Sequence, residues 1–194
     1  MIAFLHGNFV HKTPAQVHVE VNGVGYEVLI SLNTFSKIQH LEKGTLQTYF
    51  HVREDSQTLF GFFDLAEKEM FIQLISISGV GAATARMMLS AMKPEEIARA
   101  IMNGNSKQLE SIKGIGKKTA ERIVLELRDK LGKSNIEINI SPLINNTLER
   151  DALNALIALG VARPVAEQAI QKVLLSVSEQ AKVEDIIKQA LKTL

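Results

Sequence analysis

The sequence QLISISGVGAATA at residues 73–85 recurs thirty-five positions later as QLESIKGIGKKTA at residues 108–120. Eight of the thirteen aligned positions are identical, which indicates an internal repeat. Each copy shows a helical pattern, then Gly-x-Gly, then a second helical pattern that we expect to begin at Ala82 or Lys117. The repeat therefore predicts two helix-hairpin-helix motifs.

The turn of each copy consists of two glycines around one aliphatic residue. Glycine adopts backbone angles closed to other residues and lets a ligand approach the main chain. The free N–H groups at the start of the following helix favour an anion such as phosphate. A module of this kind holds the nucleic-acid backbone without reading its sequence. The predicted contacts in the two turns are Gly79, Val80 and Gly81, and Gly114, Ile115 and Gly116.

A single Gly-x-Gly is interpreted equally well as a helix end followed by a turn. Two copies favour paired hairpins, because their aliphatic residues have the same spacing and could share one core. A dinucleotide-binding GxGxxG loop is excluded, since Thr84 and Thr119 stand where the third glycine would be, and no Walker lysine follows. The matching aliphatic residues are Leu74, Ile77 and Val80 in the first copy and Leu109, Ile112 and Ile115 in the second.

The formal net charge of +1 is distributed unevenly along the chain. Residues 1–62 contain four basic and five acidic residues, whereas residues 107–133 contain eight basic and four acidic residues. Such clustering is typical of phosphate contact, although a basic helix face is more often simply solvated. The position of the cluster, around the second hairpin, favours the first interpretation.

Four basic residues of this cluster are candidate DNA contacts. Lys113 and the adjacent Lys117 and Lys118 flank the second turn, and Arg122 lies further along the same predicted helix. The first hairpin has Ser78, Ala82 and Ala83 in place of the three lysines. We therefore expect the first hairpin to bind more weakly and chiefly through its main chain.

Composition bounds the remaining function classes. The 194 residues allow two or three small domains, and a hydrophobic content of 46% is enough for packed cores. No apolar run of about 18 residues and no secretion signal is present, so neither a membrane span nor export is expected. The absence of cysteine excludes disulfides, thiolate metal sites and cysteine nucleophiles, and it is compatible with a cytoplasmic location. The five histidines lack metal-ligand spacing, so neither a metal nor another cofactor is expected.

Residues 1–63 follow a period-two pattern that predicts an antiparallel sheet. A turn signal at Asn22-Gly23 supports a strand pair at this point. Five strands with one inserted helix suggest an OB-type barrel, a fold that often binds oligonucleotides but does not fix function. The expected strands lie near residues 2–10, 16–21, 25–30, 46–52 and 58–63, and the helix near 33–40.

The last strand pair of this barrel, HVREDSQTLFGF at residues 51–62, carries Glu54 and Asp55 at its turn. Acidic residues at a turn usually serve solvation or turn formation. In a DNA-binding protein they could instead repel phosphate and keep strands apart, as an acidic pin. Both interpretations stay open on these residues alone.

Residues 64–131 predict the tandem helix-hairpin-helix domain. Its helices are expected at Asp64 to Ser76, Ala82 to Met92, Pro94 to Asn103, Ser106 to Ile112 and Lys117 to Leu131, with Pro94 in a first helical turn. Residues 132–146 lack sustained helical spacing and indicate a flexible linker, with a brief strand as the alternative.

Residues 147–194 predict a three-helix bundle near the lower size limit for independent folding. From residue 141 onward six basic and six acidic residues balance, which favours binding of a protein partner over DNA; a purely structural bundle is the alternative. The expected apolar faces are Leu148, Ala152, Leu156 and Leu159, then Val165, Ala169, Val173 and Leu174, then Val183, Ile186, Ile187, Ala190 and Leu194.

The whole chain resembles the RuvA family of Holliday-junction branch-migration proteins. The resemblance rests on NGVGYEV at 22–28, VRED at 52–55, SGVG at 78–81 and GIGKKTAER at 114–122, which occur in the order and approximate spacing of the family. Family members often have basic residues near the N-terminus and a lysine in the first hairpin. This chain has Phe4, His6 and Ala83 there.

The resemblance implies a non-catalytic subunit that binds four-way junction DNA in recombination, DNA repair and the SOS response. A homotetramer, or two per junction, would hold the junction open and square for the hexameric RuvB ATPase. It also implies that Glu54 and Asp55 form the acidic pin near the junction centre, and that both hairpins with Lys117, Lys118 and Arg122 contact the duplex arms. The C-terminal bundle would contact RuvB, and the RuvC resolvase is a further expected partner.

Three other classes remain to be weighed against this one. A nuclease or glycosylase can carry helix-hairpin-helix motifs, but Glu54 and Asp55 alone do not make a two-metal site. A general DNA-binding accessory module would bind linear duplex and four-way junction equally well. A pure protein-interaction scaffold would not bind DNA at physiological salt.

Overall fold

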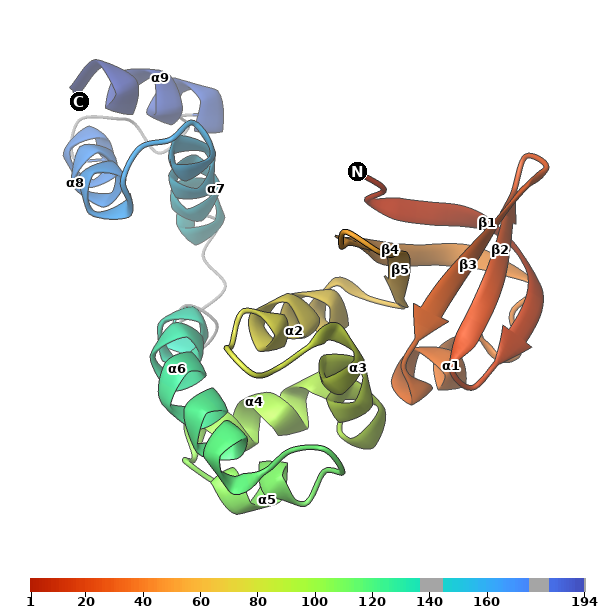
Figure 1. Ribbon diagram of the computed structural model, residues 1–194. Coiled ribbons are helices and arrows are strands. Elements are labelled where there is room, and N and C mark those ends of the chain that lie inside the picture. Colours follow the sequence, from red (N-terminus) through yellow and green to blue (C-terminus); the bar gives the residue numbers. More distant parts are fainter. Residues whose placement is uncertain (137–144, 175–181, 194) are drawn as a thin grey trace. The chain divides into compact units, whose positions relative to one another are not determined.

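The computed structural model describes residues 1–136, 145–174 and 182–193 of the chain (Figure 1). The chain divides into two compact units, Met1–Ile138 and Asn139–Leu194. The first unit contains a closed five-stranded barrel followed by helices, and the second contains helices. The predicted fold class is therefore confirmed. Within the described ranges, no helix is both long and apolar enough to cross a bilayer.

The barrel has the strand order β1-β2-β3-β5-β4, closed by pairing between β1 and β4. All neighbours are antiparallel except β3 and β5, where Leu29 pairs with Phe60 and Ile30 with Gly61. This order, with a helix between the third and fourth strands, is that of an OB-fold. The elements are β1 (Phe4–Thr13), β2 (Gln16–Val21), β3 (Val24–Ile30), α1 (Leu32–Ile38), β4 (Lys43–Val52) and β5 (Gln57–Phe62).

Strand β1 differs from the expected segment at residues 2–10, because it runs to Thr13. Its register against β2 shifts between Phe9 and His11. Such an irregularity bends a strand, so the first part of β1 can pair with β4 and its last part with β2. The shift also breaks the alternation of buried and exposed residues after Phe9, which is why the period-two pattern ended too early.

The helices of the first unit begin as expected, at both hairpins and at Pro94. The predicted end of the last one near Leu131 is wrong, because this helix continues to Ile136; residues 137–144 of the expected linker lie outside the described residues. The elements are α2 (Leu65–Ile75), α3 (Ala82–Ala91), α4 (Pro94–Met102), α5 (Ser106–Glu110) and α6 (Lys117–Ile136).

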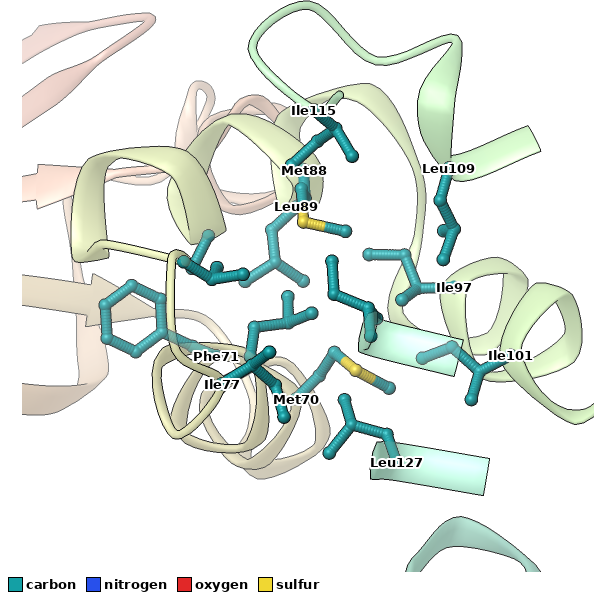
Figure 2. Close-up of a cluster of buried hydrophobic side chains, with 14 of the residues drawn as sticks. Met70, Phe71, Ile77, Met88, Leu89, Ile97, Ile101, Leu109, Ile115 and Leu127 are labelled. Atoms are coloured by element: carbon teal, nitrogen blue, oxygen red, sulfur yellow. The ribbon is translucent and has the colours of Figure 1, made fainter. Parts of the chain in front are cut away.

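One apolar core joins these five helices, as Figure 2 shows for side chains from each of them. The three aliphatic residues of the first repeat and the three of the second are all at most 6% exposed. The prediction that the two hairpins share a core is therefore confirmed. Phe60 and Phe62 of β5 belong to the same core, so the barrel is packed against the helices.

The barrel and the helices are also joined by hydrogen bonds between polar groups that are buried or, for Asn33, partly buried. The Glu67 side chain on α2 is 1% exposed, and its carboxylate accepts hydrogen bonds from Ser31 Oγ and from Thr34 Oγ1, the latter at 2.7 Å. Asn33 Nδ2 donates to the carbonyl oxygens of Leu89 and Met92 at the end of α3. We call Ser31, Asn33, Thr34 and Glu67 the barrel–helix joint.

The second unit contains α7 (Asn145–Ala158), α8 (Arg163–Leu174) and α9 (Val183–Thr193) around a core of their own. The expected apolar faces are only partly correct. Leu159, which follows the end of α7, is 64% exposed. Val165 and Leu174 are 47% and 38% exposed, because α8 turns Ala166, Ala169, Ile170 and Val173 inward. The core residues are Ala152, Leu156, Ala166, Ala169, Ile170, Val173, Ile186 and Ala190.

Burial of Glu67 predicts a pH-dependent stability. Desolvation raises the pKa of this carboxyl above its ordinary value of 4.5, although the hydroxyls of Ser31 and Thr34 oppose the rise. The folded state therefore binds the proton more tightly than the unfolded state. The free energy of unfolding should fall as the pH rises from about 4.5 to the folded pKa, by up to about 1.4 kcal/mol per pH unit.

Glu67→Gln removes this titration, so its stability relative to the wild type should increase over the same pH range. Chemical denaturation at a series of pH values measures the difference. Glu69→Gln is the matched control, because Glu69 is exposed on the same helix. Parallel pH profiles for wild type and Glu67→Gln would contradict the prediction.

Candidate nucleic-acid interface

The two repeats form turns with the same backbone geometry. Gly79 and Gly114 occupy equivalent positions with φ of +93° and +91°, a region that costs little only for glycine. The same three backbone hydrogen bonds, of 3.1, 3.0 and 2.9 Å, occur in each turn. They run from Ile77 N to Leu74 O, Val80 N to Ile77 O and Ala85 N to Gly81 O, and from Ile112 N to Leu109 O, Ile115 N to Ile112 O and Ala120 N to Gly116 O.

The outer surface of both turns is open. Val80 and Ile115 are buried, with only 4% of each exposed. They anchor the turns in the core and leave the glycines at the surface. A Cβ atom built on Gly79, Gly81 or Gly116 would meet no other atom within 4 Å. Gly81 caps α3 with an extended backbone and no side-chain hydrogen bond. The first N–H groups of α3 are therefore available to an anion.

The three lysines around the second turn lie at the surface. Lys113, Lys117 and Lys118 are all exposed, and none forms a side-chain hydrogen bond or an ion pair with another described residue. At the equivalent positions of the first turn, Ser78 and Ala83 are exposed but uncharged, and Ala82 is buried. The positive charge of the paired hairpins is thus concentrated on one of them.

Arg122 has a role that sequence reasoning missed. Its Nη1 donates a hydrogen bond of 3.0 Å to the carbonyl oxygen of Ser78, in the turn of the first hairpin. Its Nε also lies 4.0 Å from Glu126 Oε1, one turn along α6. Arg122 therefore ties the second hairpin to the first. A main-chain acceptor forty-four residues away leaves no signal in the sequence.

The two expected acidic residues lie at the tip of the β4–β5 hairpin. A hydrogen bond of 2.8 Å from Arg53 N to Ser56 O closes the turn, and both Glu54 and Asp55 are exposed. Arg53 directs its Nε to His51 Nε2 at 2.9 Å, and in the described structure it makes no ion pair with either acid. The tip therefore exposes two acidic side chains that are not paired with Arg53.

The positions at which this chain departs from the family pattern are also at the surface. Phe4 is 59% exposed on β1, and His6 is hydrogen-bonded through Nδ1 to Thr45 Oγ1 at 2.7 Å. Ala83 is exposed in the first turn of α3. None of the three adds a permanent positive charge to the surface.

Comparison with known families accounts for nearly the whole chain. The sequence model described as "RuvA N terminal domain" matches residues 1–61, and "SAM-like Helix-hairpin-helix tandem" matches residues 71–129. The model described as "RuvA, C-terminal domain" matches residues 147–194. The second match covers both repeats and both glycine turns.

Curated relatives match the chain from end to end. The protein from Cytophaga hutchinsonii is 46% identical over 99% of each chain, and the one from Christiangramia forsetii is 44% identical over 100% of each. The relative from Geobacter sulfurreducens is 42% identical over 100% of this chain and 99% of its own. All three are named "Holliday junction branch migration complex subunit RuvA". With its OB-fold barrel, paired hairpins and C-terminal helices, the chain belongs to the RuvA family.

Proposed function

We propose that this chain is the non-catalytic subunit that binds four-way (Holliday) DNA junctions and holds them open and square for branch migration in recombination and repair. The observation that carries the proposal is the pair of hairpins, which have the same backbone bonds and open glycine turns on one shared core. The names of the full-length relatives support the junction as the DNA structure that is bound.

The interface divides attraction and repulsion between two parts of the first unit. The exposed lysines at Lys113, Lys117 and Lys118 attract the duplex arms, and the N–H groups behind Gly81 and Gly116 bind phosphate. The acidic pin of Glu54 and Asp55 repels phosphate at the point where strands exchange. Because these contacts are made to the phosphate backbone of DNA, the affinity should depend little on base sequence and should fall steeply as the salt concentration rises.

The four arms of the DNA junction support the assembly of four copies of this chain. One chain offers one pair of hairpins and one acidic pin, whereas a four-way junction has four arms that meet at a single point. A closed homotetramer would present one hairpin pair to each arm and gather four pins at the centre. Either one such tetramer or two, on opposite faces of the junction, would match this geometry.

We further propose that the second unit binds the RuvB ATPase motor. Four of the eight core residues of this unit are alanine, and several larger apolar side chains of the unit are exposed. Exposed apolar residues together with balanced charge are typical of protein-binding surfaces. The exposed residues are Ile157, Leu159, Val165, Leu174 and Leu191. RuvC is a further proposed partner, because a junction held open on one tetramer leaves its other face accessible to a resolvase.

A competition gel shift tests this function. A labelled four-way junction is bound at about 0.15 M salt and challenged with excess linear duplex of matching sequence. We expect binding to survive the competitor. Loss to the duplex would identify a general DNA-binding module, no binding would identify a protein scaffold, and divalent-ion-dependent cleavage would identify a nuclease.

The open glycines give a sharp test of main-chain binding. Gly81→Ala with Gly116→Ala should fold normally, because neither new methyl group meets another atom of the protein within 4 Å. The methyl groups should keep phosphate away from the N–H groups, and the loss of one charged hydrogen bond corresponds to about a tenfold weaker affinity. Gly25→Ala is the matched control, since its methyl group is equally unobstructed but lies in the barrel. Unchanged junction affinity would contradict main-chain binding.

The lysines should contribute through counterion release. Lys117→Ala with Lys118→Ala should lower junction affinity and reduce the slope of log affinity against log salt, by about 0.9 for each phosphate that is no longer neutralised. Lys188→Ala with Lys192→Ala removes the same charge from exposed positions on α9 and should leave the slope unchanged. An identical slope for both variants would exclude direct phosphate contact by Lys117 and Lys118.

The acidic pin should act on strand exchange and should not be needed for junction affinity. Glu54→Gln with Asp55→Asn removes the repulsion of phosphate, so junction binding should stay intact or become tighter while the branch-migration rate changes. Glu42→Gln with Glu69→Gln removes two exposed charges elsewhere and serves as the control. Loss of binding by a normally folded pin variant would show that the sign of this effect is wrong.

A further inference from the structure

We propose that the barrel–helix joint sets the position of the acidic pin relative to the hairpins and thereby determines the preference for four-way junctions over linear duplex. The inference rests on the proposed function, because it assigns residues to junction selectivity. Glu67, Ser31, Asn33 and Thr34 would not touch DNA. They are positioning residues that act through the pin and the hairpins.

The path of the chain places the joint between these two elements. Strand β5 begins just after the pin and ends at Phe62. The next residue, Phe63, donates its N–H to Thr34 Oγ1 at 3.0 Å. Asp64 then caps α2 by accepting a hydrogen bond of 2.9 Å from Glu67 N. Since α2 leads directly into the first hairpin turn, the segment from pin to hairpin is held at its middle by α1.

The hydrogen bonds at the barrel–helix joint hold the barrel in one orientation relative to α2, in addition to keeping the two in contact. Each carboxylate oxygen of Glu67 accepts from one hydroxyl. Ser31 Oγ also accepts from Thr34 N at 3.0 Å, and Thr34 Oγ1 accepts from Phe63 N. Every group thus has a defined partner in a buried setting. An apolar cluster could pack here in several orientations, whereas a satisfied polar network favours one.

Further hydrogen bonds connect the barrel to α3, which follows the first hairpin turn, and connect the first hairpin to the second. Asn33 holds the end of α3, Leu32 N donates to Ser90 Oγ at 3.1 Å, and Arg86 Nη1 donates to Ala15 O of the barrel at 3.0 Å. Helix α3 begins at the first hairpin turn, so these bonds fix to the barrel the helix that carries this turn. The bond from Arg122 to Ser78 then links the second hairpin to the first.

Binding of linear duplex and binding of a four-way junction should depend differently on the position of the acidic pin relative to the hairpins. A duplex needs only a hairpin pair, which the helical core holds together on its own. A junction must also bring its strand-exchange point to the acidic pin while its arms lie on the hairpins. A loosened joint should therefore spare duplex binding and reduce junction binding.

The first measurement compares affinities for junction and duplex at one salt concentration. Glu67→Ala and Asn33→Ala should each reduce the junction preference, by about tenfold for Glu67→Ala, with duplex affinity unchanged. Glu67→Gln keeps the shape and one acceptor and should largely restore the preference. Val19→Ala is the control for lowered stability, because it opens a cavity in the separate barrel core and should leave the preference unchanged.

The second measurement determines, in the absence of DNA, the distance between the acidic pin and the helices that carry the hairpins. The chain has no cysteine, so spin labels can be placed specifically at Gln57→Cys beside the pin and Glu110→Cys on α5. Labelled protein is diluted with unlabelled protein so that distances within one chain dominate. We expect a narrow distance distribution in the wild-type background and in Val19→Ala, and a clearly broader one in Glu67→Ala and Asn33→Ala.

The two measurements test separately whether the joint positions the pin, whether this position determines junction preference, and whether the protein prefers junctions at all. An unchanged distance distribution in the joint variants would overturn the inference whatever the DNA results. A broader distribution with wild-type junction preference, or with junction and duplex affinity lowered equally, would overturn the link to selectivity. If the wild type itself shows no junction preference, the proposed function fails, while the distances still show whether the joint positions the pin. If Glu67→Ala does not fold, Asn33→Ala provides the same comparison.

Discussion

The apolar core shared by the two hairpins is the constraint on which the rest of the first unit depends. Helix α5 has only five residues and could not persist alone, because helices of this length are unstable in water. It is held by Leu109, which is completely buried among residues from the other helices (Figure 2). Burial of Val80 and Ile115 turns the glycines outward. The outward position of the glycine turns, on which the proposed DNA-binding surface rests, is therefore a consequence of core packing.

The same core also explains why one repeat differs from the other in charge but not in shape. The positions that pack are aliphatic in both copies, whereas the exposed residues Ser78 and Ala83 correspond to the exposed lysines Lys113 and Lys118. Ala82 is buried, and the exposed Lys117 stands at the equivalent position. In the proposed interface, the second hairpin would supply most of the electrostatic attraction for DNA, and the first would supply a main-chain surface of the same geometry. Arg122 binds the carbonyl of Ser78 and makes the pair a single structural element, which two independent hairpins would not be.

Much of the architecture was predictable from local patterns. The repeat fixed the positions of both turns, alternation in residues 1–63 predicted the barrel, and Pro94 marked a helix start. The predictions failed where a nonlocal effect decides the outcome. The register shift after Phe9 extends β1, and α8 buries Ala166 in place of the larger Val165. In a small bundle, the residue that faces the neighbouring helix need not be the most hydrophobic one.

By itself, the sequence determined the two glycine turns, the basic cluster beside the second and the acidic turn at Glu54 and Asp55, because each depends on residues close together in the chain. Only the tertiary structure decided how these pieces are joined. Glu67 meets Ser31 across thirty-six positions, and Arg122 meets Ser78 across forty-four. Such contacts are set by how the barrel and the helices pack, and a polar residue in a sequence does not reveal which distant group will satisfy it.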